Sequence, residues 1–191
     1  MTPDDLLAFW FGAPPGSPTY GRSREIWFEK DAAFDAACRM QMGAAHEEAA
    51  MGRLDHWAET PRGALALVLL LDQAPRNLFR GDPRAFATDA KARALADAAI
   101  ARGFDRGLLP TERMFLYLPF EHSEALADQE RALELFAELN TLPETAGILA
   151  IVRRHHDIIA RFGRFPHRNA VLGRITTAEE AAFLREPNSS F

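Results

Sequence analysis

Residues 65–78 read LALVLLLDQAPRNL, and this stretch decides the fold. Its first seven residues, 65–71, are apolar on every face of a helix, so we expect a central helix that neighbours enclose on all sides. Asp72 follows at once, and the proline at position 75 predicts that the helix ends there, where the helix dipole disfavours negative charge. We therefore expect a cation, from Arg76 or from residues 161–168, to pair with Asp72.

Helix signals dominate on both sides of this stretch. Alanine-rich segments place apolar residues at three- and four-residue spacing, and no alternating run typical of a strand appears. The chain is therefore predicted to be all-α, a single domain over 1–191 with seven to nine helices. Threonines with capping spacing or a following proline predict helix starts at Thr2, Thr60, Thr141 and Thr177. Breaks are predicted at 12–21, near 75, at 81–83, at 103–110, near 119 and at 163–166.

Composition excludes several classes of protein. With 191 residues, 48% hydrophobic and 26% charged, the chain can bury a core. A net charge of −5 argues against nucleic-acid binding, and no apolar run approaches the ~20 residues that span a bilayer. The single cysteine, Cys38, suits a reducing compartment, so a cytoplasmic location is expected. No cofactor and no metal site are predicted.

Charge is segregated along the chain. Residues 151–174 carry a net charge of +5, which leaves −10 for the rest. Within this segment Gly163 predicts a helix end, and a new helix is expected near 167–169. A helix N-terminus beside guanidinium groups is a ready anion site. An arginine network between helices, which neutralises Asp72, explains the same residues equally well.

Two histidines are candidates for proton transfer. His155 lies on the apolar stripe of its helix, so it is either a core histidine bonded to a carbonyl or a pocket residue. His122 precedes Ser123, which is predicted to cap a helix that begins with Glu124. Capping explains Ser123 and Glu124 but not His122, which we expect to point into a pocket.

Three strings of the sequence carry a specific resemblance: 69–81 (LLLDQAPRNLFRG), 115–124 (FLYLPFEHSE) and 156–169 (HDIIARFGRFPHRN). Together they resemble the bacterial family called domain of unknown function 924, and the similarity extends over nearly the whole chain. The resemblance implies a tetratricopeptide-like fold of stacked antiparallel helix pairs, and no assigned activity. Ala74 departs from the family, which usually has phenylalanine after Asp-Gln.

Two functions stay open. The first is a pocket that binds a small anionic or polar ligand, with acid/base chemistry as an extension. The second is a helical-repeat module that binds a peptide, a protein partner or a second copy of the chain. Enrichment of aromatic and charged residues in turns between helices favours the pocket. The candidate catalytic residues are Asp72, His122 and His155, and the candidate ligand-binding residues are Gln73, Arg76, Asn77, Glu124, Arg161, Arg164, His167, Arg168 and Asn169.

Overall fold

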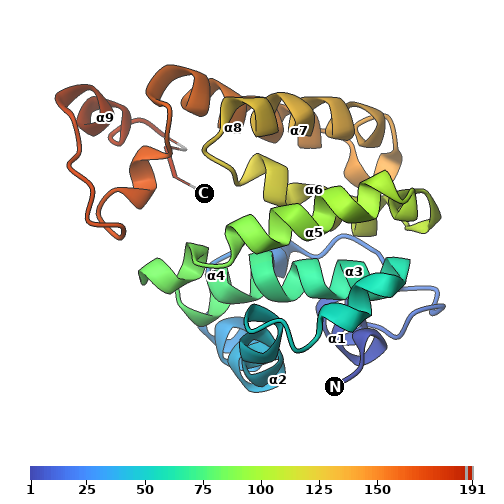
Figure 1. The fold of residues 1–191 in the computed structure, drawn as a ribbon. Helices are drawn as coiled ribbons and strands as arrows, with labels where there is room; N and C mark the ends of the chain where they lie inside the picture. Colours follow the sequence, from blue (N-terminus) through green and yellow to red (C-terminus); the bar gives the residue numbers. More distant parts are fainter. Residues whose placement is uncertain (188, 191) are drawn as a thin grey trace.

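The computed structural model describes residues 1–187, 189 and 190, and this part of the chain is all-α, without strands. The helices are α1 (Pro3–Phe11), α2 (Ala32–Ala50), α3 (Pro61–Val68), α4 (Ala74–Leu78), α5 (Asp89–Ala101), α6 (Pro110–Glu121), α7 (Leu126–Leu139), α8 (Ile148–Phe162) and α9 (Ala178–Phe183). The helices pack around the central segment formed by α3 and α4 (Figure 1). Short 3-10 turns lie at Glu25–Trp27, Asp55–Glu59, Pro83–Phe86, Phe104–Gly107, Pro143–Thr145 and Pro166–Arg168.

The prediction that the central helix ends near Pro75 is wrong. A π-helical turn, Leu69–Gln73, joins α3 to α4, so the helix continues. Proline lacks the N–H that would bond to the carbonyl of Leu71, and the wider π turn accommodates its ring. The hydroxyl of Thr88 donates to that carbonyl at 2.6 Å instead. Asp72 therefore lies inside a continuous helical rod and not at a helix C-terminus.

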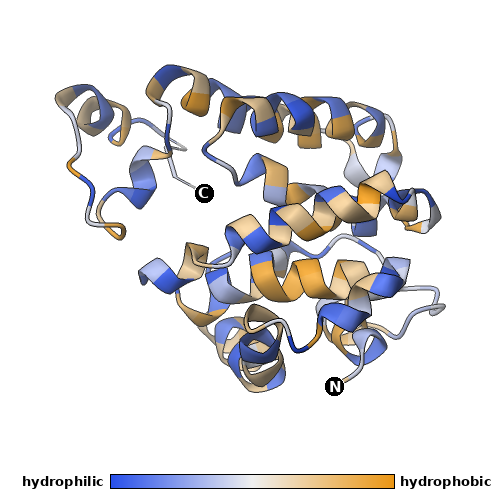
Figure 2. Ribbon diagram, viewed as in Figure 1, coloured by the Kyte–Doolittle hydropathy of each residue, from blue (hydrophilic) through white to orange (hydrophobic). Residues whose placement is uncertain are grey.

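Neighbouring helices enclose the central rod. Helix α1 packs on α3 and α2 packs on α4, while α5 and α6 cover the opposite side (Figure 1). Helices α7 and α8 pack together beyond α6, and α9 lies at the far end of that layer. From Ala64 onward the α3 segment is apolar, whereas the outer helices mix polar and apolar residues (Figure 2).

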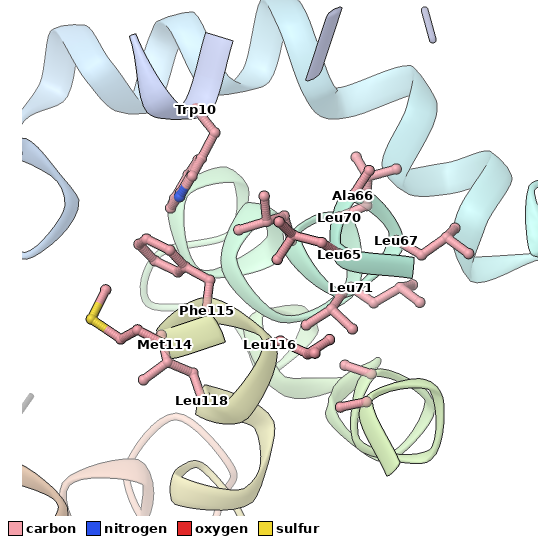
Figure 3. Packing of buried hydrophobic residues seen from close by; sticks show 14 of the residues in the cluster. Trp10, Leu65, Ala66, Leu67, Leu70, Leu71, Met114, Phe115, Leu116 and Leu118 are labelled. Carbon is pink, nitrogen blue, oxygen red and sulfur yellow. The ribbon is translucent and has the colours of Figure 1, made fainter. Parts of the chain in front are cut away.

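Every side chain from Leu65 to Leu71 is fully buried, which confirms the expected enclosure. Helices α1, α2, α5 and α6 all pack on this segment, and Figure 3 shows Trp10 of α1 and Phe115 of α6 among the side chains around it. The ring of Phe115 meets those of Trp10 and Trp27 at centroid distances of 5.3 and 4.9 Å, both edge to face. Such pairs add to the stabilisation from area burial.

The predicted helix starts at Thr2, Thr60 and Thr177 are confirmed, since each threonine side chain accepts a backbone hydrogen bond from the first turn. The start at Thr141 is wrong. Its hydroxyl donates back to the carbonyl of Glu138, and α8 begins only at Ile148. Asn140 instead accepts from the amides of residues 147 and 149 and so fixes the turn.

Three further local predictions are wrong. Helix α6 runs through Pro119 without a break. Helix α7 begins at Leu126 rather than Glu124, because Ser123 accepts from the amide of Ala125 and donates to Asp128. The helix expected near 167–169 is only a three-residue 3-10 turn, so no helix N-terminus offers an anion site there.

The part of the chain that the structure describes has eight helical rods when α3, the π turn and α4 are taken as one, within the expected seven to nine. Successive helices from α5 to α8 pack on one another. The specific tetratricopeptide-like stacking stays a prediction. Within the described residues, no helix is both long and apolar enough to cross a bilayer.

Candidate functional site

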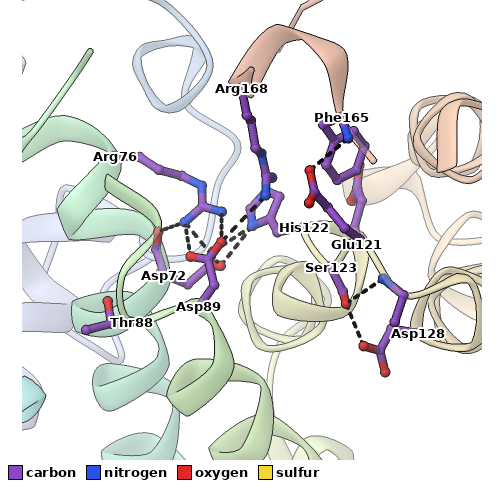
Figure 4. A network of polar contacts seen from close by, with 12 residues as sticks. Asp72, Arg76, Thr88, Asp89, Glu121, His122, Ser123, Asp128, Phe165 and Arg168 are labelled. Carbon is purple, nitrogen blue, oxygen red and sulfur yellow. Dashed lines mark hydrogen bonds and ion pairs between the residues drawn. The ribbon is translucent and has the colours of Figure 1, made fainter. Parts of the chain in front are cut away.

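Polar side chains from four segments that are distant in sequence meet beside the π turn (Figure 4). They come from the central rod, the first residue of α5, the end of α6 and the turn that follows α8. We call this group the polar cluster; it consists of Asp72, Arg76, Asp89, Glu121, His122 and Arg168.

Asp72 is fully buried at the centre of the cluster, and all its neighbours there are donors. Nδ1 of His122 lies 2.8 Å from Oδ1 and 3.0 Å from Oδ2, and the amide of Gln73 donates to Oδ2 at 2.6 Å. The expected cation is Arg76, whose Nη1 lies 3.4 Å from Oδ1. Burial alone would raise the pKa of Asp72, but Arg76, His122 and Gln73 together hold it well below its usual range.

The Asp72 carboxylate also fixes the tautomer of His122. A carboxylate only accepts, so Nδ1 of the ring carries the hydrogen and Nε2 keeps the lone pair. Burial and the charge of Arg76 lower the pKa of His122 below its usual value, although Asp72 opposes the shift. At neutral pH the ring is therefore an uncharged, oriented base, the arrangement in which an aspartate prepares a histidine for proton transfer.

A second histidine–carboxylate pair stands next to the first. Nδ1 of His155 lies 2.9 Å from Oε1 of Glu121 and 3.0 Å from the carbonyl oxygen of Ile151. The Glu121 side chain is 2% exposed and that of His155 is 6% exposed. The rings of His122 and His155 are 6.5 Å apart. His155 is thus bonded to a carbonyl, as expected of a core histidine, and it also lies next to His122, the other candidate for proton transfer.

Arg76 is fully neutralised within the cluster. Its guanidinium donates to both oxygens of Asp89 at 2.9 and 3.0 Å, and also to the carbonyl of Asp72. This two-pronged geometry is the strong form of an arginine–carboxylate pair.

Arg168 is different because it is buried without hydrogen bonds. Its side chain is 8% exposed and lies over the rings of Phe86 and Phe165, at 4.7 and 4.5 Å from their centroids. Its nearest carboxylate oxygen, on Asp89, is 3.8 Å away, and within the described part of the chain the guanidinium has no hydrogen-bond acceptor. Burial, with the charge of Arg76, lowers its pKa to about 10, so it stays charged at neutral pH.

Two predicted ligand-binding residues hold the backbone of the turn in place. Glu124 accepts from the amide of Phe165 at 2.8 Å and from Arg174 at 2.7 and 3.0 Å. Arg174 in turn donates to Asn169 and to the carbonyl of Phe165. Glu124 and Asn169 thereby fix the position of Arg168.

The structure places Arg161 and Arg164 away from the polar cluster. Arg161 pairs with Glu179 on the surface, and Arg164 forms a two-pronged pair with Glu180. Both contacts attach α9 to the end of α8. Arg161 and Arg164 therefore serve structural pairs with α9 and do not contact Asp72.

The remaining predicted residues support the cluster. Gln73 bonds to Asp72, and Asn77 donates to the carbonyl of Gln73 and accepts from Arg80. His167 packs beside the ring of Phe165, and burial lowers its pKa to about 3, so its ring is neutral.

The sequence analysis missed Glu121 and Asp89. Glu121 directly precedes His122, and its charge at the end of the largely apolar run 114–120 was a signal that could have been used. Asp89 gave no such signal, because an acidic residue in the first turn of a helix is common.

The described residues offer no group of three histidine, cysteine or carboxylate side chains able to hold a metal. A cavity of about 650 Å³ lies elsewhere, between the starts of α1 and α3, and another of about 460 Å³ lies near Arg113 and Glu138.

Comparison with known proteins places the chain in a family. The model for "Bacterial protein of unknown function (DUF924)" matches residues 6–188, so the chain belongs to this family. It is similar to a solved structure of a protein of unknown function from Agrobacterium tumefaciens, with 44% identity, 96% coverage of each chain and a TM-score of 0.84. No curated protein matches it.

Proposed function

We propose that this member of the DUF924 family binds a small anionic or polar ligand at the polar cluster and that His122 exchanges a proton with it. Asp72 orients His122, and Arg168 contacts the ligand's anionic group. The observation that carries the proposal is the buried guanidinium of Arg168. A buried charge without hydrogen bonds costs several kcal/mol, and an anion that accepts two of its N–H groups offsets that cost.

The acid/base role rests on the geometry of His122. Its Nδ1 is committed to Asp72, and within the part of the chain that the structure describes nothing hydrogen-bonds to Nε2. The ring is 15% exposed, so Nε2 is available to a ligand beside Arg168. A neutral, oriented imidazole is suited to accept a proton near neutral pH.

The origin of the cluster favours a pocket over an interaction module. Its residues come from a π turn, helix ends and a turn between helices, and the aromatic rings of Phe86 and Phe165 enclose the cation. A peptide groove would instead repeat polar residues along successive helix faces.

The test measures thermal unfolding with phosphate, sulfate and small carboxylates. A ligand at 100 times its Kd stabilises the folded protein by about 2.7 kcal/mol, or roughly 5–10 °C for a chain of this size. We expect such a rise with at least one of these anions, and we expect it to vanish in Arg168→Ala and in the less disruptive Arg168→Gln.

Arg161→Ala is the matched control, because Arg161 is an arginine of the same segment that lies on the surface. It should keep the full rise. If no anion raises the melting temperature, or if the rise survives in both Arg168 variants, the pocket is wrong and the interaction module takes its place.

A further inference from the structure

Within the described part of the chain, two buried polar atoms of the polar cluster, one acceptor and one donor, lack a hydrogen-bond partner. Oε2 of Glu121 is an acceptor that no described residue bonds to, although Oε1 is paired with His155. Nε of Arg168 is a buried donor that bonds to no described residue. The two residues are 2% and 7% exposed, so bulk water does not readily satisfy these atoms.

The two atoms flank the same histidines. Glu121 is bonded to His155, whose ring lies 5.5 Å from the ring of Phe165, and Arg168 covers that phenylalanine. In the view of Figure 4 the side chain of Arg168 extends toward His122, and Glu121 is the residue directly before His122. A single small molecule beside His122 would therefore meet an acceptor at one end and a cation at the other.

The charge balance narrows the choice of ligand. Asp72 and Asp89 lie beside the guanidinium groups of Arg76 and Arg168, and Glu121 is a third acidic side chain of the cluster, paired with His155. The nearby Glu124 is already neutralised by Arg174. A simple anion would contact Arg168 but leave Oε2 of Glu121 without a donor, whereas a zwitterion would supply a carboxylate for Arg168 and an ammonium group for Glu121.

We propose that the ligand is a small amino carboxylate, held with its carboxylate on Arg168 and its ammonium group on Oε2 of Glu121. This inference rests on the proposed function and specifies its ligand class. It makes Glu121 a specificity-determining residue, a role separate from the acid/base role of His122.

The test compares alanine, lactate and propionate, which share a three-carbon skeleton and differ in the group at the second carbon. Binding to the intact protein is measured by isothermal titration calorimetry at neutral pH. We expect alanine to bind at least about tenfold more tightly than propionate, because propionate leaves Glu121 without a donor. We expect lactate, which lacks the positive charge, to bind more weakly than alanine.

Glu121→Gln keeps the shape of the side chain and removes its charge. In this variant the preference for alanine over propionate should fall below about threefold, while propionate itself binds at least as well as to the natural protein. Glu138→Gln, at an exposed glutamate on α7, is the control and should keep the full preference.

The outcomes separate the two proposals. If propionate binds through Arg168 but alanine binds no better, or if lactate equals alanine, the amino-carboxylate assignment is wrong while the anion site stands. If none of the three binds and the inorganic anions also fail, both proposals are wrong. A preference for alanine that persists in Glu121→Gln overturns the role of Glu121.

Discussion

Replacing Asp72 by asparagine tests the centre of the cluster with little change in shape. Asp72 receives hydrogen bonds from His122 and Gln73 and lies beside Arg76, whereas asparagine has one acceptor oxygen and no charge. In the variant Arg76 keeps its pair with Asp89, but His122 and Gln73 lose the carboxylate that accepts from both, and a buried donor left unsatisfied costs about 1–3 kcal/mol, which at about 2–4 °C per kcal/mol is a fall of about 2–12 °C in the melting temperature.

Thermal unfolding of the natural protein and of Asp72→Asn is measured from pH 7 downward. The pKa of Asp72 is lowered in the folded state, so its contribution to the free energy of unfolding is complete above the unfolded value of about 3.9 and is lost below it. The difference in melting temperature between the two proteins should therefore stay constant from pH 7 to about 4 and become smaller below that.

Glu138→Gln is again the reference, because its salt bridge with Arg113 is on the surface, with the glutamate side chain 69% exposed. Such pairs contribute about 0–1 kcal/mol. Equal melting temperatures for Asp72→Asn and Glu138→Gln at pH 7 would refute the buried ion pair. If the difference in melting temperature between Asp72→Asn and the natural protein does not become smaller below pH 4, the electrostatic origin of that difference is refuted.

Two further predictions concern the central rod. Leu69→Ala should lower the free energy of unfolding by about 2–5 kcal/mol through lost burial and a cavity, measured by urea unfolding, whereas Ile175→Ala, at a residue 88% exposed, should change it by less than about 0.5 kcal/mol. Thr88→Val keeps the side-chain shape but leaves the carbonyl of Leu71 without its donor, and should cost about 1–3 kcal/mol in the same assay; an unchanged midpoint would show that the π turn does not need this bond.

The parts of the fold that were predicted correctly are those with a local physical cause. Residues 65–71 are apolar on all faces and are buried on all faces, and Thr2 caps its helix as its spacing requires. Two of the errors have a common origin, since proline was assumed to end helices at positions 75 and 119. Both helices continue, and at position 75 the wider π turn and the hydroxyl of Thr88 compensate for the missing N–H.

The site was harder to predict because its pairs join distant segments. The pairing of Asp72 with Arg76 spans four residues along one rod and could be expected from spacing alone. The pairing of Asp72 with His122 spans fifty residues and depends on how α6 packs against the rod, which no local pattern specifies. Glu121 escaped notice for the same reason, since its partner His155 lies on α8.

The arginines of residues 151–174 show why a charge pattern alone does not identify a binding residue. Arg161, Arg164 and Arg174 each have a carboxylate partner within 2.9 Å, so their excess charge is balanced by acidic residues from other segments. Arg168 has the same sequence context, yet it is buried against two aromatic rings with its nearest carboxylate at 3.8 Å. Because an arginine that serves only the fold gains most from a close partner, the absence of one among the described residues at a buried position distinguishes Arg168 from its neighbours. The sequence thus locates the basic segment, and the unsatisfied hydrogen bonds single out the residue within it.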